Sequence, residues 1–236
     1  MNFKKIKLPD HIGIIMDGNG RWALKRGLSR IIGHKNGVEA VRKTIRYASD
    51  IGLKVLTLFA FSTENWKRDK NEIHGIFDIV EQYLETDLDE FKSRDIKFRT
   101  MGDITKLPKR IYKKLTECTK QTCNNKGLIL NVAINYGARD ELLLACNNLI
   151  KKGKPATLED LKNNLYSSDL PDPDLIIRTS GEMRLSNFML FQSAYSELYF
   201  TNSYWPAFDM KQFNRALIEY SKRDRRFGGN HKNVQK

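Results

Sequence analysis

Six short runs of β-branched and other apolar residues, separated by amphipathic stretches, most constrain the fold of this sequence. They are Ile12 to Met16, Val55 to Phe61, Ile96 to Met101, Leu128 to Ile134, Leu175 to Ile177 and Leu198 to Phe200. Runs of this composition and length predict strands. Those around Ile14 and Leu58 are apolar on both faces, as parallel strands covered by helices require. We therefore predict an α/β fold with an open, mostly parallel six-stranded sheet flanked by helices.

The stretches between these runs carry apolar residues at helical spacing. Predicted helices lie around Val38 to Ala48, from Ile73 to Phe91, from Pro108 to about Cys123, from Arg139 to Lys151, from Thr157 to Leu165, and from Asp209 to Arg226. The acidic residues Asp87, Asp89 and Glu90 are expected on a solvated helix face. A length of 236 residues fits one large domain, in which residues 1–10 and 230–236 are expected to be flexible tails.

The charge of the chain points to an anionic partner. Forty-one Lys and Arg against 28 Asp and Glu give a formal net charge of +13. Nucleic acid, a membrane surface or a phosphorylated small molecule would all fit, and much of the excess is expected to be solvated surface. The three cysteines are expected to be free thiols, and the longest apolar stretch is too short to span a bilayer. We expect a cytoplasmic protein, at most peripheral at the inner membrane face.

The first polar loop, Asp17-Gly18-Asn19-Gly20-Arg21-Trp22, follows the first predicted strand directly. Open α/β sheets bind ligands at the carboxyl ends of their strands. Gly18 and Gly20 let backbone amides approach a phosphate, and a following helix N-terminus adds donors. Asp17 would repel a phosphate unless a cation such as Mg²⁺ lay between them, which makes it a candidate metal ligand. A strand-ending Asp-Gly turn with Arg21 as a surface charge explains the same residues equally well.

The second polar loop runs from Ser62 to Arg68, directly after the strand predicted to end at Phe61. A helix N-cap with Trp66 packing beside it explains Ser62, but leaves the combination of Asn65, Trp66 and Arg68 unexplained. A tryptophan next to an arginine also suits stacking on single-stranded nucleic acid, which is the main alternative for this segment.

The third polar loop runs from Arg178 to Phe188 and again follows a short apolar strand. Two arginines six residues apart, Arg178 and Arg184, with hydroxyls and a glycine between them, suit a diphosphate gripped by forked hydrogen bonds. Surface salt bridges to Glu182 and Glu197 are the slightly favoured explanation for this segment taken alone. Together, three such loops after parallel strands predict two phosphate-bearing ligands held side by side.

Three sequence strings carry a resemblance to a known family: residues 11–22, 61–66 and 178–188, with further likeness at 194–200, 205–206 and 225–229. They resemble the cis-prenyltransferases, which include bacterial undecaprenyl diphosphate synthase. The resemblance implies a homodimeric enzyme with a hydrophobic tunnel that uses Mg²⁺ to extend an allylic diphosphate, farnesyl diphosphate, with isopentenyl diphosphate units. The implied product is undecaprenyl diphosphate, the precursor of the lipid carrier for cell-wall polysaccharide.

The resemblance also assigns roles to individual residues of the three loops. Asp17 and Glu197 would hold Mg²⁺. The allylic diphosphate would be bound by Gly18, Asn19, Gly20, Arg21, Trp22, Arg30 and His34, and the isopentenyl diphosphate by Arg178, Arg184, Leu185 and Ser186. The residues expected to close over both substrates are Ser62, Thr63, Glu64, Trp66 and Arg68.

Asp17 and Asn65 are the residues that the resemblance makes catalytic. An amide is too weak a base to take the C2 proton unaided, so we interpret Asn65 as an orienting group in a relay through water or a diphosphate oxygen. Departures from the commoner family pattern include Ser180 in place of Gly, Asp69 where Pro often stands, and Met183 where some members carry His. Met183 does not favour a hard cation such as Mg²⁺.

Two other classes of protein compete with the enzyme interpretation. A nucleic-acid-binding module would use the positive charge and bind with strong salt dependence, but Asp17 and Glu197 in basic loops speak against it. A pseudo-enzyme subunit would keep the fold and act as a partner, and the joint presence of Asp17, Asn65 and Arg178 speaks against that. We therefore expect a homodimer with transient membrane-surface contact for product release and no nucleic-acid partner.

Overall fold

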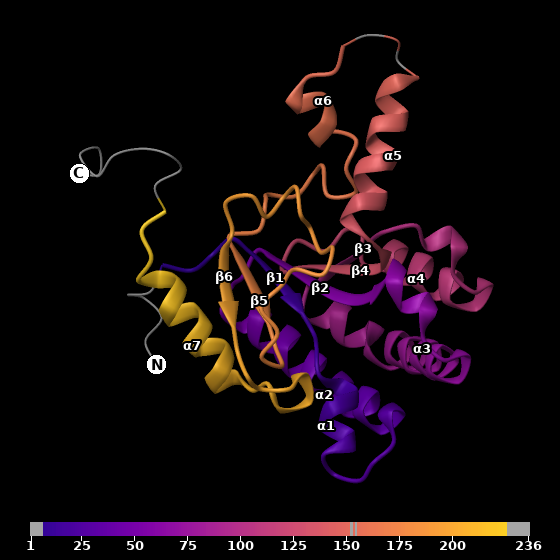
Figure 1. Ribbon diagram of the computed structural model, residues 1–236, viewed down its shortest axis with the longest axis vertical. Coiled ribbons are helices and arrows are strands. Elements are labelled where there is room, and N and C mark those ends of the chain that lie inside the picture. Colours follow the sequence, from indigo (N-terminus) through magenta and orange to yellow (C-terminus); the bar gives the residue numbers. More distant parts are fainter. Residues whose placement is uncertain (1–6, 152, 154, 226–236) are drawn as a thin grey trace.

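A computed structural model describes residues 7–151, 153 and 155–225 and shows one six-stranded sheet, fanned by its twist (Figure 1). The strands are β1 (His11–Ile15), β2 (Val55–Ser62), β3 (Lys97–Met101), β4 (Ile129–Tyr136), β5 (Leu175–Arg178) and β6 (Glu197–Phe200). Their order is β3-β4-β2-β1-β5-β6, and every neighbouring pair is parallel. Each strand begins within one residue of its predicted start, so the predicted α/β class is confirmed.

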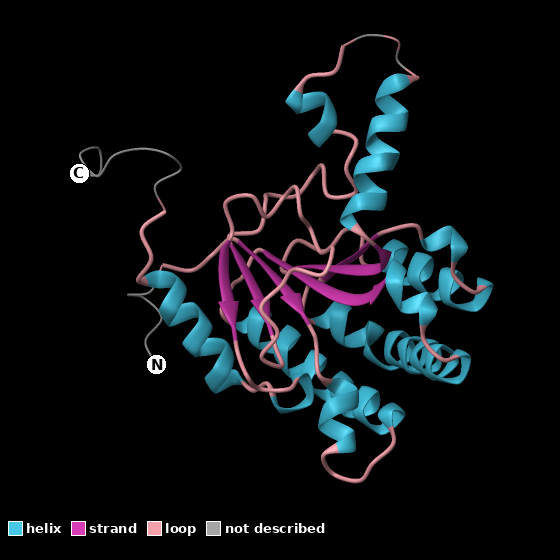
Figure 2. Ribbon diagram, in the orientation of Figure 1, coloured by secondary structure: helices cyan, strands magenta, loops and turns pink. Residues whose placement is uncertain are grey.

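Both faces of the sheet are covered, which explains why its central strands are apolar throughout. All five residues of β1 are buried. Ile12, Ile14 and Leu58 point to a large core built with helices on one face, while Ile15 joins a smaller cluster on the other. Phe188, from the connection between β5 and β6, packs into that smaller cluster. Figure 2 shows helices crowded on one face, and loops with α5 and α6 on the other.

The helices are α1 (Asn19–Leu24), α2 (Arg30–Asp50), α3 (Lys70–Ser93), α4 (Lys109–Gln121), α5 (Ala138–Ile150), α6 (Leu158–Lys162) and α7 (Met210–Ser221). Short 3₁₀ segments are η2 (Thr63–Lys67), η3 (Ile104–Lys106) and η4 (Trp205–Ala207). Six of the α-helices correspond to predicted ones. The exception is α1, which occupies the first polar loop: Trp22 N–H closes its first turn on the carbonyl of Gly18 at 2.8 Å.

Two sequence predictions about helices are wrong. The last helix was expected to reach Arg226, but α7 ends at Ser221, because Arg223 and Arg225 leave the helix to pair with Glu197 and Asp174. Position 226 itself lies outside the described residues.

Asp87 was expected on a solvated helix face, yet only 4% of it is exposed. Arg42 of α2 donates to both of its carboxylate oxygens, with Nη2 2.7 Å from Oδ2. A buried charge is tolerated when it is paired in this way, and the pair joins α2 to α3.

Most of the two predicted tails, residues 1–6 and 230–236, lies outside the described residues. Residues 7–10 contact the body of the protein: Leu8 packs against the large core, and Asp10 N–H donates to Asp174 Oδ2 at 2.7 Å. Within the described ranges, none of the helices combines the length and apolar character needed to cross a membrane.

The strand order places the ligand-binding crevice expected of an open α/β sheet beside β1. From β1 the chain proceeds to β2 on one side, and it returns after β4 to β5 on the other side. Open α/β sheets bind ligands in the crevice formed at such a reversal, outside the carboxyl ends of the strands. Asp17 follows β1, and Arg178 is the last residue of β5.

A cavity of about 660 Å³ begins at this crevice and extends between the sheet and two helices. Its deep part is apolar, with Val41 and Ile45 from α2, Val80 and Leu84 from α3, and Leu58 from β2. Its polar end includes Asp17, His34, Asn65, Arg68 and Arg178. The fold therefore joins a charged rim to an apolar interior, and the hydrophobic tunnel implied by the resemblance stays a prediction.

Candidate active site

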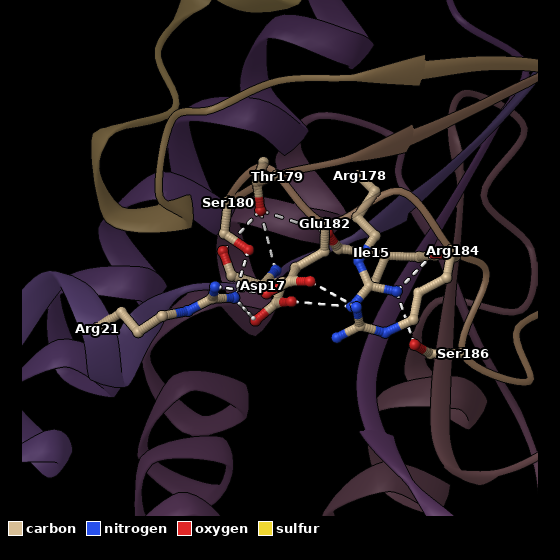
Figure 3. Close-up of polar contacts among 9 residues, drawn as sticks. All are labelled: Ile15, Asp17, Arg21, Arg178, Thr179, Ser180, Glu182, Arg184 and Ser186. Carbon is tan, nitrogen blue, oxygen red and sulfur yellow. Dashed lines mark hydrogen bonds and ion pairs between the residues drawn. The ribbon is translucent and has the colours of Figure 1, made fainter.

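Arg178 and Asp17 form the centre of the candidate site (Figure 3). Arg178 Nη2 donates to Asp17 Oδ2 at 2.9 Å, and its Nη1 donates to Ser186 Oγ at 2.6 Å and to the carbonyl of Arg184. Only 4% of the Arg178 side chain is exposed, against 28% for Asp17. The third loop thus surrounds the Arg178 side chain and directs its guanidinium group toward Asp17.

Thr179 fixes the backbone at Asp17. Its Oγ1 accepts a hydrogen bond from Asp17 N–H at 2.9 Å and donates one to the Asp17 carbonyl at 2.7 Å. Burial raises the pKa of Asp17. The hydrogen bonds and positive charges of Arg178 and Arg21 together have a larger and opposite effect, so the pKa lies below its ordinary value. Asp17 is therefore an anion at neutral pH, held at the rim of the cavity.

Arg21 links the first loop to the third. Its Nη2 lies 3.1 Å from Asp17 Oδ1 and donates to Ser180 Oγ at 2.6 Å, while its Nη1 donates to Glu182 at 2.6 Å. Arg184 pairs with the other oxygen of Glu182. The surface salt-bridge explanation therefore holds for Arg184 but not for Arg178, whose partner is Asp17.

Gly18 is required where the first loop turns into α1. Its φ of +102° lies in a region that residues with a Cβ rarely adopt, and a Cβ there would lie 2.6 Å from the ring of Tyr204. Ser180, which replaces the commoner Gly, also has a positive φ of 76°. Its hydroxyl accepts from Arg21, which gives the serine a partner that glycine would lack.

The second loop forms the single turn η2. Ser62 N–H donates to Asn65 Oδ1 at 3.1 Å, so the amide oxygen of Asn65 is occupied by the backbone. Trp66 packs against Phe61 and Phe77, with ring centroids 5.3 and 5.6 Å away, and its Nε1 donates to Asn135 at 2.7 Å. The packing explanation thus accounts for Trp66, and Asp69, in the place of the commoner Pro, caps α3 by accepting from its first amides.

Asn187 ties the second loop to the third and was not assigned a role from the sequence. Its Nδ2 donates to Glu64 Oε1 at 2.9 Å, and its Oδ1 accepts from Arg139 N–H at 2.9 Å. Its φ is +62°, a conformation that Asn tolerates better than most residues. Both Asn187 and Arg139 line the cavity. The available signal was the position of Asn187 directly after Ser186 in the third motif.

Arg68 and His34 meet at Glu72 on the other side of the cavity mouth. Arg68 Nη1 donates to Glu72 Oε1 at 3.1 Å, and His34 Nε2 lies 3.3 Å from the same oxygen. Burial, and after it the nearby Arg68 charge, lowers the pKa of His34 below its ordinary value. The imidazole is therefore neutral at pH 7 and available as a hydrogen-bonding group.

The structure brings about half of the predicted site residues to the cavity. Those that line it are Asp17, Asn19, His34, Ser62, Glu64, Asn65, Arg68, Arg178 and Ser186. Those outside its lining are Gly18, Gly20, Arg21, Trp22, Arg30, Thr63, Trp66, Arg184, Leu185 and Glu197. Most of the second group lies in the same three loops, so it surrounds the mouth rather than facing the interior.

Glu197 lies at the opposite end of the sheet. Glu197 is the first residue of β6 and pairs with Leu175 of β5. Leu175 pairs in turn with Ile12 of β1, and Ile12 precedes Asp17 by five positions. At roughly 3.3 Å per strand residue, Glu197 and Asp17 are more than about 15 Å apart. Glu197 pairs instead with Arg223 at 2.8 Å. Asp17 and Glu197 of one chain are therefore too far apart to share an ion, so the metal pair stays a prediction that would need Glu197 of the partner subunit.

The donors at Asp17 fit Mg²⁺ only in a site shared with a phosphate ligand. Asp17 offers one ionised carboxylate, and buried Asn19 Oδ1, also at the cavity, has no hydrogen-bond partner among the described residues. Those residues contain no group of three or more His, Cys, Asp or Glu side chains that could hold a metal. Mg²⁺ commonly takes one or two carboxylates and completes its shell with substrate phosphates and water. The arrangement suits that mode and not a closed protein cage.

Comparisons with known proteins agree with this geometry. The model of a family described as putative undecaprenyl diphosphate synthase matches residues 15–228. Isoprenyl transferases of Fusobacterium nucleatum and Bacillus subtilis are 47% and 48% identical to the chain; the matches cover 94% and 95% of it, and 96% and 89% of those proteins.

Two solved structures are similar over nearly the whole chain. One is lavandulyl diphosphate synthase from Lavandula x intermedia in complex with dimethylallyl diphosphate, with a TM-score of 0.91, 34% identity, and coverage of 94% of this chain and 98% of that one. The other is a probable undecaprenyl diphosphate synthase from Campylobacter jejuni, with a TM-score of 0.79, 35% identity, and coverage of 94% and 99%.

Proposed function

Since this chain belongs to the undecaprenyl diphosphate synthase family and is thus a prenyl transferase, we propose that it joins isopentenyl diphosphate to an allylic diphosphate. The reaction is a Mg²⁺-dependent, repeated cis addition, with farnesyl diphosphate as the primer. Its product is undecaprenyl diphosphate, the precursor of a lipid carrier for cell-wall polysaccharide. The enzyme acts in the cytoplasm as a homodimer.

One observation carries this proposal: a buried arginine paired with an ionised aspartate stands at the rim of an apolar cavity of about 660 Å³. An isoprenoid diphosphate has the same two parts, a charged head and a hydrocarbon tail. Arg178 and Arg21 match the head, since guanidinium groups bind phosphate oxygens by paired hydrogen bonds. Residues such as Val41, Val80 and Leu84 match the tail.

The residues at the rim of the cavity would have different chemical roles in this reaction. Diphosphate leaves an allylic carbon when its growing charge is stabilised, and Arg21 supplies preorganised donors for that charge, while Arg178 would hold the isopentenyl diphosphate beside it. Asp17 would hold Mg²⁺, which when bound adds Lewis-acid stabilisation of the leaving oxygens. Asn65 Oδ1 is held by Ser62 N–H, which leaves Nδ2 to orient a diphosphate oxygen or a water that accepts the C2 proton.

The test is incorporation of radiolabelled isopentenyl diphosphate into a butanol-extractable product, with farnesyl diphosphate as primer and with or without Mg²⁺. We expect incorporation only with Mg²⁺, and its loss in Asp17→Ala while the circular dichroism spectrum is unchanged. Asp89→Ala is the matched control, because that carboxylate is 97% exposed on α3. Undiminished turnover in Asp17→Ala would contradict the metal role, and no incorporation by the wild type under any condition would contradict the reaction.

A nucleic-acid-binding function gains no support from the second loop. The alternative required Trp66 to stack on a base; its ring is 40% exposed, but it packs against both Phe61 and Phe77 and its Nε1 is bonded to Asn135. The proposal instead includes transient contact with a membrane, because a long polyprenyl product is insoluble in water and must leave the enzyme into lipid.

A further inference from the structure

A basic and apolar projection stands next to the mouth of the cavity. It consists of the second half of α1, the turn that follows and the first residue of α2, residues 22–30. Figure 1 shows this segment extending beyond the carboxyl ends of β1 and β5, away from the sheet. Two of its leucines are exposed, Leu24 to 55% and Leu28 to 39%. Gly27 turns between them with a φ of +69°, and nothing lies within 4 Å of where its Cβ would be.

The charges of this projection are of one sign. From Gly18 to Val38 the sequence contains five Lys and Arg and no Asp or Glu. Lys25, Arg26 and Arg30 are exposed. Lys25 Nζ lies 5.0 Å from the ring centre of Tyr204, and the Arg26 guanidinium lies 4.3 Å from that of Trp22, so aromatic rings support two of the cations. Exposed leucines among cations and aromatic rings are typical of segments that bind at a membrane interface.

Another group of exposed apolar residues lies on α5, where Leu143 is 62% and Leu144 is 42% exposed. That helix has Asp140 and Glu141 in its first turn, so its surroundings do not carry the uniform positive charge of the α1 projection. An anionic surface would therefore be attracted to α1 more strongly than to α5.

The projection and the cavity share a helix. Asn19 lines the cavity, and Leu24 ends the same helix, which at 1.5 Å per residue is about 8 Å further along its axis. A bilayer in contact with Leu24 and Leu28 would thus lie close to the polar rim, where a product leaves the cavity. Resting on the proposed function, we propose that residues 22–30 dock the enzyme on an anionic lipid bilayer and place the cavity mouth at the lipid surface.

The test is co-sedimentation of the full chain with vesicles, without substrates. Vesicles of phosphatidylcholine alone are compared with vesicles containing phosphatidylglycerol, at low and high salt. We expect the wild type to bind the anionic vesicles, and to bind them less as salt screens the cations. Leu24→Ser with Leu28→Ser should lower the partition coefficient by about ten-fold or more, because two apolar side chains no longer enter the interface.

Leu143→Ser with Leu144→Ser on α5 is the matched control, with a similar pair of exposed leucines, and should bind vesicles like the wild type. Equal binding by the α1 variant and the wild type, or loss of binding only in the α5 variant, would overturn the proposal. So would light scattering that showed the α1 variant to have lost a subunit, since a second copy would then cover this surface.

Failure of this inference is distinguishable from failure of the proposed function. Vesicle binding is measured without prenyl transfer, and prenyl transfer is measured separately in detergent solution, where the α1 variant should keep wild-type turnover. If the enzyme were active in detergent but did not bind anionic vesicles, only the docking proposal would be contradicted.

Discussion

Arg178 Nη2 lies 2.9 Å from Oδ2 of Asp17, and this bond joins two residues that are 161 positions apart in the sequence. Each residue supplies the counter-charge that the other needs near the protein interior. A diphosphate at the rim would compete with Asp17 for Arg178, and a cation would compete with Arg178 for Asp17. The pair therefore holds the site ready for ligands of both signs.

Arg178→Lys should lower turnover by about 100-fold or more while the protein stays folded. A single ammonium group lacks the fork with which Arg178 reaches Asp17, Ser186 and the Arg184 carbonyl together. Steady-state incorporation of labelled isopentenyl diphosphate measures the effect. Arg46→Lys is the matched control, because Arg46 makes a similar forked contact, with Glu90 on α3, away from the site. A similar loss of turnover in both variants would show that the forked contacts of Arg178 have no specific role in the reaction.

Tyr83→Ala should lengthen the product, whereas Tyr83→Phe should leave its length unchanged. Tyr83 lines the cavity, and the removed ring is comparable in size to one five-carbon isoprene unit. Its hydroxyl is buried without a hydrogen-bond partner among the described residues, so Tyr83→Phe should also stabilise the fold by about 1 kcal/mol. Thin-layer chromatography of the lipid product and urea denaturation measure the two effects. An unchanged product from Tyr83→Ala would remove this residue from the control of chain length.

Asp87→Ala should destabilise the protein by about 3 kcal/mol, because it leaves Arg42 without its main partner between α2 and α3. Arg42→Met combined with Asp87→Leu should recover much of that loss, since no charge is then left unpaired. Urea denaturation of Arg42→Met, of Asp87→Leu and of the double variant gives the coupling free energy.

The control for that experiment is Glu85→Gln, which breaks an ion pair with Lys114 whose side chains are 50% and 40% exposed. Exposed pairs contribute between zero and about 1 kcal/mol. A loss in Asp87→Ala as small as in Glu85→Gln would mean that the buried pair does not hold the two helices together.

Acid should destabilise the fold before ordinary carboxylates titrate. His11 is fully buried, with one ring nitrogen 2.7 Å from the Pro171 carbonyl and the other 2.7 Å from Thr57 Oγ1. Burial lowers the pKa of His11 from 6.5 to about 4. Between pH 6.5 and 4, His11 is therefore protonated in the unfolded chain but mostly neutral in the folded protein. The free energy of unfolding should fall by about 3 kcal/mol as the pH drops from 6.5 to 4.

Urea denaturation of the wild type and of His11→Gln across that pH range measures this dependence. The slope should be shallower in His11→Gln but not zero, because the lowered pKa of His34 acts in the same direction. The control is His74→Gln, at an exposed histidine on α3. An unchanged slope in His11→Gln would assign the acid sensitivity to other groups.

The sheet could be predicted from the sequence because its strands are buried on both faces and so read as continuous apolar runs. The helix α1 could not, because its six residues include Gly20 and are too few to show a helical period. The end of α7 was overestimated because Arg223 and Arg225 take partners on distant strands and loops, which a local pattern does not reveal.

The candidate site was predictable as three loops but not as a set of contacts. Asp17 and Arg178 were both singled out, yet their mutual bond depends on β5 lying beside β1. Burial of Asp87 depends on Arg42, 45 positions away on another helix. Gly33 was passed over, although a Cβ there would lie 2.1 Å from the Asn19 carbonyl, so it lets α2 pack against the start of α1.

The strand order has a consequence for how the protein is made. β1 is among the first segments to leave the ribosome, but its neighbour β5 is synthesised only after β2, β3 and β4. A nascent chain can therefore assemble four strands while Asp17 still lacks its arginine. A chain that stops short of residue 178 would lack Arg178 and the whole third loop, so the charged rim of the cavity can form only after most of the chain has been synthesised.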